Sequence, residues 1–300
     1  CEASVGGGIP ILMPLHQSLA ANQIESIVGI LNGTTNYILS QMTETGVNYA
    51  NALADAQKQG FAEADPTNDV CGFDAARKLA ILSSIGFRAN VTFDDVLVEG
   101  IEKIDKSDIQ YAKDMGYTIK LLTVALRQEN GIALNVYPAF LPDNHPLSSV
   151  KGAYNAIYVT GNIVDDIMFY GRGAGALPTA SAVMGDVIST AQHILNGSTG
   201  TGMIMTDTKR IPFYSSLKLQ NSYYFRLDVD DVTGVLSQIA AAFAENDISI
   251  CEVVQKRKTK GLAELVLITE LASRESILQV EKGLQVLPCM RKVANVIRVM

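Results

Sequence analysis

Cysteine and histidine are scarce in this chain of 300 residues, and neither is spaced like a structural framework. The four cysteines lie far apart and form no CxxC pair, and the three histidines share no spacing typical of metal ligands. Cysteines without a pairing pattern are typical of reduced thiols. We therefore expect free thiols in a cytoplasmic protein, without a structural zinc.

Clustered positive charge and long apolar runs are also lacking. The net charge is −7, and the largest basic cluster is the short KRKTK run at residues 256–260, which argues against a nucleic-acid partner. No apolar run approaches the roughly 20 residues of a membrane span. No signal peptide is recognisable, so we expect no membrane partner.

Apolar residues, in contrast, are plentiful. They make up 48% of the chain, which is enough for a large core, and the length predicts two domains or three. The chain opens at Cys1, directly in a small, apolar, glycine-rich segment. We therefore expect that an N-terminal portion of the protein precedes this sequence.

Residues 60–78 form the densest group of charges. The acidic residues there are Glu63, Asp65, Asp69 and Asp74. From Asp74 the pattern is helical, with Asp74 as the expected N-cap, so Asp74 and Lys78 share one face four residues apart. A charge run is commonly a solvated surface. The alternative is a site that binds a polar substrate and transfers a proton through Lys78.

Three other turns offer groups to a ligand, each with a plain structural alternative. Residues 2–14 place three glycines beside Glu2, so oxygen atoms there either hold a hard cation or only form a tight turn. Residues 171–179 (GRGAGALPT) precede a predicted helix and either cradle an anion or pack against the sheet. In residues 32–36, Thr34 and Asn36 either face a ligand, or Thr34 or its neighbour caps a helix.

Hydrophobic periodicity predicts an α+β fold, a mixed or antiparallel sheet covered by helices. Strands are expected at 24–31, 118–127, 131–139, 154–161 and 163–170, and helices at 37–45, 48–58, 74–84, 107–115 and 180–195. Residues 196–208 have the composition of a linker. From residue 221 the order is β-α-β-β-α-β, a ferredoxin-like unit.

Four of these stretches together resemble homoserine dehydrogenase. They are residues 2–10 (EASVGGGIP), 32–37 (NGTTNY), the acidic stretch 63–78 and 173–175 (GAG). They occur in that family's order and cover the chain to about residue 195. The last eighty residues resemble an ACT domain, through DVTGVL at 231–236 and NDISI at 246–250.

The resemblance implies reduction of L-aspartate 4-semialdehyde to L-homoserine by NAD(P)H, in threonine and methionine biosynthesis. It implies that Lys78 is the proton donor or acceptor and that Glu63 binds substrate. Asp69 and Asp74 would bind the substrate amino group or orient the lysine, and Thr34 would lie near the substrate. These residue types suit the chemistry, because a lysine stabilises a developing alkoxide and carboxylates bind ammonium.

A cation, a cofactor and an assembly are also implied. A monovalent ion such as Na⁺ would be held by Glu2, Val5, Gly7 and Ile9, mainly through backbone oxygens. Gly173 would approach NADP or NAD. ACT domains pair, so a homodimer or homotetramer is expected.

Three parts of the chain follow from the resemblance. Residues 1–22 would be a remnant of a nucleotide-binding domain, 23–208 the catalytic and dimerisation domain with its linker, and 221–300 the ACT regulatory domain. Because the family's nucleotide-binding unit comes first, we expect the chain as given to bind NAD(P) poorly and to turn over little or not at all.

Two departures and two alternatives belong beside this interpretation. Phe61 stands where relatives often carry tyrosine, and Asn68 where some carry an acid. A second hypothesis is a non-catalytic, dimerising module that binds an amino acid, threonine first, near Asp231 and Gly234. A lyase with Lys78 as a Schiff base is the weaker alternative, because neighbouring carboxylates favour the ammonium form.

Overall fold

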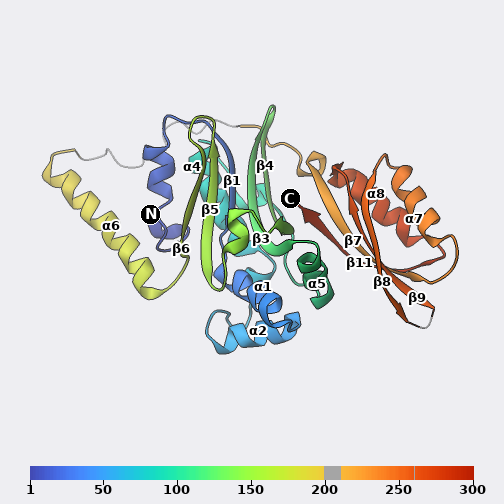
Figure 1. The fold of residues 1–300 in the computed structure, drawn as a ribbon. Coiled ribbons are helices and arrows are strands. Elements are labelled where there is room, and N and C mark those ends of the chain that lie inside the picture. Colours follow the sequence, from blue (N-terminus) through green and yellow to red (C-terminus); the bar gives the residue numbers. More distant parts are fainter. Residues whose placement is uncertain (199–210, 260) are drawn as a thin grey trace.

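The computed structural model describes residues 1–198, 211–259 and 261–300. Within these ranges the strands form one sheet in the order β6-β5-β1-β3-β4-β11-β7-β9-β8, with β2 beside β4 and β10 beside β7 (Figure 1). The strands are β1 Ile24–Ile30, β2 Leu97–Val98, β3 Tyr117–Gln128, β4 Gly131–Pro142, β5 Tyr154–Gly161, β6 Asp165–Arg172, β7 Gln220–Asp230, β8 Ile250–Thr259, β9 Leu262–Thr269, β10 Ala272–Ser273 and β11 Met290–Val299.

Along the chain the α-helices of the described ranges all lie between β1 and β11. They are α1 Gly33–Thr45, α2 Tyr49–Lys58, α3 Thr67–Val70, α4 Phe73–Gly86, α5 Lys106–Asp114, α6 Ala176–Leu195, α7 Val235–Ala244 and α8 Arg274–Gln285. None of the helices in the described ranges combines the length and apolar character needed to cross a bilayer.

In the N-terminal half of the sheet the long strands pair antiparallel, the short β2 pairs parallel with β4, and a buried apolar cluster lies on each face. Strands β3 and β4 pair along their whole length, and β5 and β6 form a second hairpin, as the period-two pattern predicts. Helices α1, α4 and α5 pack on β3. Because side chains alternate along β1, Ile27 joins the core under these helices while Val28 and Ile30 join a smaller cluster on the other face.

The C-terminal unit has the predicted β-α-β-β-α-β order, with its own core between the sheet and helices α7 and α8. Its last strand, β11, pairs antiparallel with β7 and parallel with β4, through Arg298 beside Ala139 and Val299 beside Phe140. The two units therefore share one continuous sheet, which the sequence did not predict. The boundaries 1–22, 23–208 and 221–300 stay predictions, and most of the expected linker lies outside the described residues.

Two predicted helix starts are wrong. Helix α4 begins at Phe73 after Gly72, whose φ of 83° only glycine adopts readily, so Asp74 lies in the first turn and is not the N-cap. Helix α1 begins at Gly33, and its N-cap is Asn32 rather than a threonine. Asp74, which does not cap α4, instead accepts a hydrogen bond from the Asn32 side chain at 2.9 Å.

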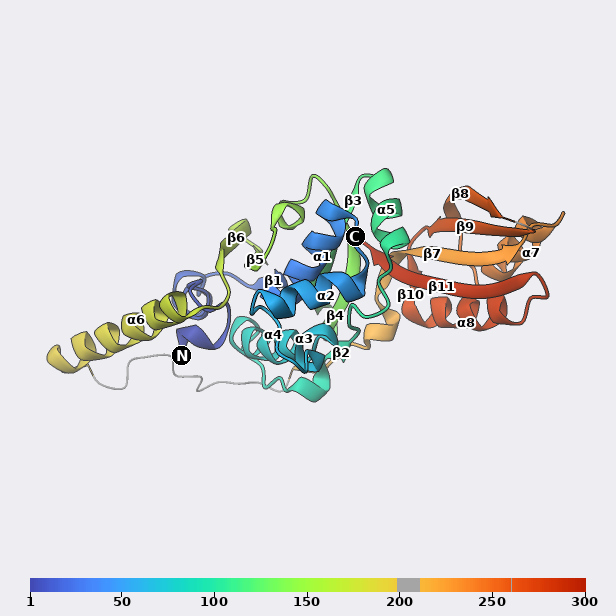
Figure 2. The same ribbon diagram turned by 90° about the horizontal axis from the view of Figure 1, so that it is seen from below.

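Helix α6 stands apart from the rest of the fold. It projects from the molecule in both views (Figures 1 and 2), and within the described ranges it packs mainly against the N-terminal residues. None of its side chains is buried. It begins at Ala176, four residues before the predicted start.

Candidate functional site

A polar cluster forms where β1 ends and helices α1 and α4 begin. Asn32 follows β1 directly, and its Oδ1 accepts the backbone N–H of Thr35 at 2.9 Å, as an N-cap does. The Nδ2 of the same side chain donates to Asp69 Oδ1 at 2.7 Å and to Asp74 Oδ2 at 2.9 Å. One buried amide thus joins the start of α1 to a carboxylate of α3 and a carboxylate of α4.

Lys78 completes this cluster. Its Nζ donates to Asp74 Oδ2 at 2.7 Å, one turn earlier on α4, and to the carbonyl oxygen of Leu31 at 3.1 Å. The side chains of Lys78 and Asp74 are 22% and 32% exposed. The pair is therefore neither a solvated surface bridge nor sealed from water, and the ammonium group can reach a ligand.

Asp69 is the other carboxylate of the cluster. Burial raises the pKa of the Asp69 carboxyl above its ordinary value, the hydrogen bond from Asn32 opposes that rise, and the charge of Asp74 adds to it. Two acids thus stand close together, held by one amide and one lysine. Such a group is suited to an ammonium ligand, because a positive charge would relieve the repulsion between the carboxylates.

Thr34 lies beside these residues, but Glu63 does not contact them. The Thr34 hydroxyl donates to the carbonyl oxygen of Phe61 at 2.6 Å and also contacts Asp69. The ring of Phe61 packs against Tyr37 with 4.6 Å between ring centroids, so Phe61 contacts Thr34 through its backbone carbonyl and not through its side chain. The Glu63 side chain is exposed, and within the described ranges its carboxylate contacts none of the cluster's side chains.

The two glycine-rich turns, residues 6–8 and residues 171–175, contact each other away from the Lys78 cluster. The Gly8 N–H donates to the carbonyl oxygen of Arg172 at 3.0 Å. Gly7 has a φ of 57°, and a Cβ built on it would lie 2.4 Å from the Gly173 carbonyl oxygen. A Cβ on Gly173 would lie 2.0 Å from Nδ2 of Asn155. Both glycines are thus required by close packing, which is the structural alternative stated for these turns.

Residues 153–155, at the start of β5, connect the Lys78 cluster to the Gly173 turn, and Asn155 is the residue at that turn. Its Oδ1 is buried without a hydrogen-bond partner. Two residues earlier, the carbonyl oxygen of Ala153 is 2.9 Å from a Cβ built on Gly33, next to Asn32. The start of β5 therefore touches both the α1 turn and the Gly173 turn. An unpartnered buried acceptor at a glycine turn is a feature of ligand sites.

The Glu2 carboxylate is engaged by the backbone. It accepts the backbone N–H groups of Ile11, of Leu12 at 2.9 Å and of Met13 at 3.0 Å, which engages both of its oxygens. Among the described residues no group of three or more His, Cys, Asp or Glu side chains is arranged to hold a metal. Backbone oxygens beside the close contact of Gly7 with Gly173 are the remaining donors suited to a hard cation.

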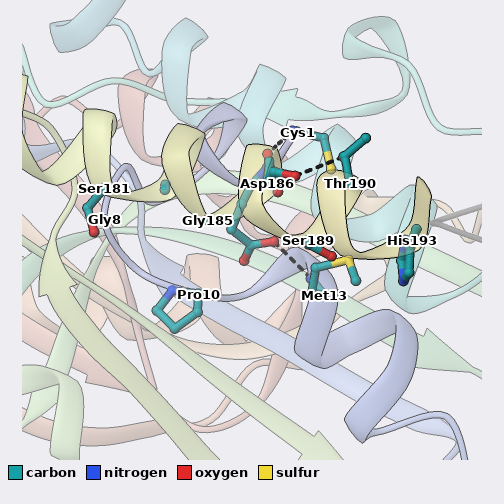
Figure 3. Close-up of a pocket in the computed structure, with 12 residues that line it drawn as sticks. Cys1, Gly8, Pro10, Met13, Ser181, Gly185, Asp186, Ser189, Thr190 and His193 are labelled. Atoms are coloured by element: carbon teal, nitrogen blue, oxygen red, sulfur yellow. Dashed lines mark hydrogen bonds and ion pairs between the residues drawn. The ribbon is translucent and has the colours of Figure 1, made fainter. Parts of the chain in front are cut away.

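A cavity of about 520 Å³ lies between residues 1–13 and α6 (Figure 3). On the α6 side, Asp186 accepts the Glu2 backbone N–H at 3.0 Å and the amino group of Cys1. Figure 3 shows Met13 and His193 at one end of the cavity and Gly8, Pro10 and Ser181 at the other. The cavity is separate from the Lys78 cluster, and it borders the glycine segment expected to hold the cation.

The turn expected to bind an effector has an ordinary backbone explanation. Gly234 precedes α7 with a φ of 89°, and the Asp231 N–H donates to the carbonyl oxygen of Gly261 at 2.9 Å.

His145, the loop histidine, caps a short helical turn through Nδ1, which accepts the Leu147 N–H at 3.1 Å. Burial lowers the pKa of His145.

Sequence reasoning missed Asn32 as a site residue. The signal was present, because asparagine directly before a helix is a favoured N-cap. The sequence could not show that Nδ2 of the same amide donates hydrogen bonds to two acids, which lie 37 and 42 residues further along the chain.

A buried amide, two carboxylates and a lysine at a strand-to-helix turn define an enzyme that handles a small polar substrate, here joined to a ferredoxin-like module. The family model for homoserine dehydrogenase matches residues 10–188, and the ACT domain model matches residues 223–289. The chain therefore belongs to the homoserine dehydrogenase family, and its C-terminal unit is an ACT domain.

Individual relatives agree with this assignment. The homoserine dehydrogenase of Corynebacterium glutamicum is 42% identical over 302 residues, which covers 99% of this chain and 67% of that protein. The crystal structure of the enzyme from Thiobacillus denitrificans has a TM-score of 0.94 at 37% identity, over 100% of this chain and 69% of that one. A hyperthermophilic archaeal homoserine dehydrogenase mutant, solved with NADPH, has a TM-score of 0.55 at 27% identity and covers 64% of this chain and 55% of that one.

The family is one of NAD(P)-dependent oxidoreductases in amino-acid biosynthesis. The expectation that the chain as given is inactive draws no support from these matches and stays a prediction.

Proposed function

We propose that this chain supplies the substrate-binding and proton-transfer groups for NAD(P)H-dependent reduction of L-aspartate 4-semialdehyde to L-homoserine. The observation that carries the proposal is the Lys78 ammonium group, held by Asp74 and the Leu31 carbonyl beside the half-buried Asp69. This is the step of threonine and methionine biosynthesis that the resemblance implies.

Each group has a role that its surroundings support. When bound, NAD(P)H supplies a hydride to the aldehyde carbon. The Lys78 ammonium donates a hydrogen bond and then a proton to the aldehyde oxygen, which stabilises the developing alkoxide. Asp69 binds the substrate ammonium group, and Asp74 orients Lys78 from one helical turn away. Thr34 borders this space, and Glu63, whose side chain is exposed, would add a carboxylate that binds substrate.

The chain's contributions to cation and cofactor binding are backbone groups. The backbone carbonyl oxygens of Glu2, Val5, Gly7 and Ile9 would hold a monovalent cation such as Na⁺, while the Glu2 carboxylate fixes the turn through its bonds to residues 11–13. The turn at Gly173 would approach NADP or NAD. Its fit rests on the unpartnered Oδ1 of Asn155 beside it.

The experiment is a semialdehyde-dependent NADPH oxidation assay. It is run on the purified protein of residues 1–300. Asp69→Asn is expected to raise KM much more than it lowers kcat, because it removes a group that binds the substrate ammonium. Asp94→Asn, an exposed acid outside this segment, is the control. Unchanged KM in Asp69→Asn would contradict the role of Asp69.

A second function concerns the ACT domain, which matches residues 223–289. We propose that it binds an amino-acid effector, threonine first, near Asp231 and Gly234, and that it pairs two chains into a homodimer or homotetramer. Calorimetry with threonine and a panel of amino acids tests the binding, and sedimentation tests the assembly. Absence of heat from every amino acid would refute the effector proposal.

A further inference from the structure

A cavity of about 500 Å³ lies where the ACT domain meets the N-terminal unit. One wall is the connection at residues 98–104, between β2 and α5. The other wall is formed by α8 and by the middle of β11. The volume falls within the range of small-molecule sites, roughly 300–1,000 Å³. The cavity shares no lining residue with the Lys78 cluster or with the cavity beside α6, and it is lined by charges of both signs.

The charges are loosely paired across the cavity. Arg274 of α8 binds Glu281 at 2.6 Å, but its Nε is 3.9 Å from Oε1 of Glu99 on the opposite wall. Glu102 and Lys103 add one charge of each sign to that wall. Three carboxylates and two cationic groups thus border one space. A simple anion or a simple cation would meet repulsion there, whereas a small zwitterion satisfies both kinds of group.

Glu99 connects the lining of this cavity to the sheet. Arg298 of β11 donates to both of its oxygens at 2.9 Å, and the Arg298 guanidinium lies 4.1 Å from the centre of the Tyr137 ring. Neighbouring arginines hold the pKa of the Glu99 carboxyl below its ordinary value, against the effect of burial. Glu99 is therefore an anion that a ligand ammonium can share with Arg298.

The same wall is fastened to the helix that carries Asp69. The Ile101 N–H donates to the carbonyl oxygen of Val70 at 2.8 Å. A Cβ built on Gly100 would lie 2.3 Å from that same oxygen, so the two backbones are in direct contact. Cys71 Sγ donates to Glu102 at 3.1 Å. A shift of residues 99–102 must therefore move α3 and, with it, Asp69.

We propose that this cavity binds a small zwitterion, its carboxylate on Arg274 and Lys103 and its ammonium on Glu99 and Glu102, and that occupancy shifts Asp69 through residues 100–102. The site is separate from the Asp231–Gly234 turn. The β11 residues that line the cavity, 293–296, lie beside Leu227 to Phe225 in the middle of β7, whereas the turn follows the end of β7, where Met290 lies beside Val229. The link to catalysis rests on the role proposed for Asp69, whereas the binding does not.

The test is calorimetry at low ionic strength with glycine, L-serine and L-threonine as zwitterions, and with acetate and ethylammonium as singly charged controls. At least one zwitterion is expected to bind about tenfold more tightly than either control, because each control leaves one charge-assisted hydrogen bond unmade. Arg274→Met and Glu102→Gln should each weaken that binding about tenfold. Asp231→Asn, in the other candidate site, should leave it within twofold.

Hydrogen exchange on the same protein measures the transmission. Saturating zwitterion is expected to slow exchange of the Ile101 amide several-fold. Three results would overturn the proposal: no heat from any zwitterion, binding that Asp231→Asn abolishes while both cavity variants retain it, or binding by acetate or ethylammonium as tight as by the zwitterions. Binding without a change at Ile101 would overturn the transmission. Because none of these readouts involves the dehydrogenase reaction, they stay separate from a failure of the proposed activity.

Discussion

Replacing Asn32 with aspartate separates the two tasks of this side chain. Aspartate is as good an N-cap as asparagine, so α1 keeps its cap. The variant loses the two donors to Asp69 and Asp74. Hydrogen bonds to charged groups contribute about 1.5–3 kcal/mol each, and the lower value applies to this partly exposed cluster. The expected loss in the free energy of unfolding is therefore about 3 kcal/mol near pH 8.

The pH dependence of this loss follows from the carboxylates. The pKa of Asp69 is already raised in the folded protein, and a third carboxylate within hydrogen-bonding distance would raise the carboxyl pKa values further. A carboxyl with a raised folded pKa contributes stability that is present at low pH and lost as pH rises through that pKa. The destabilisation by Asn32→Asp should therefore shrink as the pH is lowered from 8 towards 5.

Urea unfolding followed by circular dichroism at pH 5 and pH 8 measures both effects. The matched control is Asn48→Asp, because Asn48 caps α2 with its Oδ1 2.9 Å from the Asn51 N–H and is exposed. That change should cost less than about 0.5 kcal/mol at either pH. The reasoning would be refuted if Asn32→Asp matched the control at pH 8, or if its cost did not fall at pH 5.

Three further predictions concern the rest of the fold. Asp108→Ala should lower the free energy of unfolding by about 3–5 kcal/mol, because it removes a fully buried carboxylate that binds the buried Arg226 at 2.7 Å. Arg291→Ala breaks a partly exposed pair and should cost only about 0–1 kcal/mol. Equal costs of the two changes in urea unfolding would contradict this prediction. Gly173→Ala should lower the thermal midpoint, and Asn155→Gly in the same chain should restore part of it, since the new Cβ meets the Asn155 amide; no restoration would show that the clash is elsewhere. Burial lowers the pKa of Lys120 to about 8, so the free energy of unfolding should rise between pH 8 and about 10, as Lys120 of the unfolded chain loses its proton. Lys120→Met should flatten this rise in unfolding measured across that range. An unchanged slope would count against this prediction.

The sequence predicted what depends on neighbours along the chain. Period-two patterns predicted the hairpin of β3 and β4, and the spacing of four residues predicted the ion pair of Asp74 and Lys78. These features depend on contacts within a few residues or across a tight turn, so the local pattern contains the information.

The features that were not predicted depend on partners far apart in the sequence. Asn32 bridges acids on two other helices, and the parallel pairing of β11 with β4 joins strands separated by about half the chain. The Glu2 carboxylate was expected beside a cation, but it is engaged by the backbone of residues 11–13, a turn whose shape no spacing rule gives. Glu63 was assigned by resemblance alone, and its exposed position leaves that role a prediction.

The central claim is that Lys78 transfers the proton in the reduction of the semialdehyde. It is tested most directly by chemical rescue of Lys78→Ala in the NADPH oxidation assay, with Lys58→Ala as control. The loss of a general acid should lower kcat by about 10²–10⁴-fold. Added primary amines should restore part of the rate, in proportion to their concentration and in the order of their acidity. A rate within twofold of the unmodified protein, or a large loss that no amine restores, would contradict the role given to Lys78.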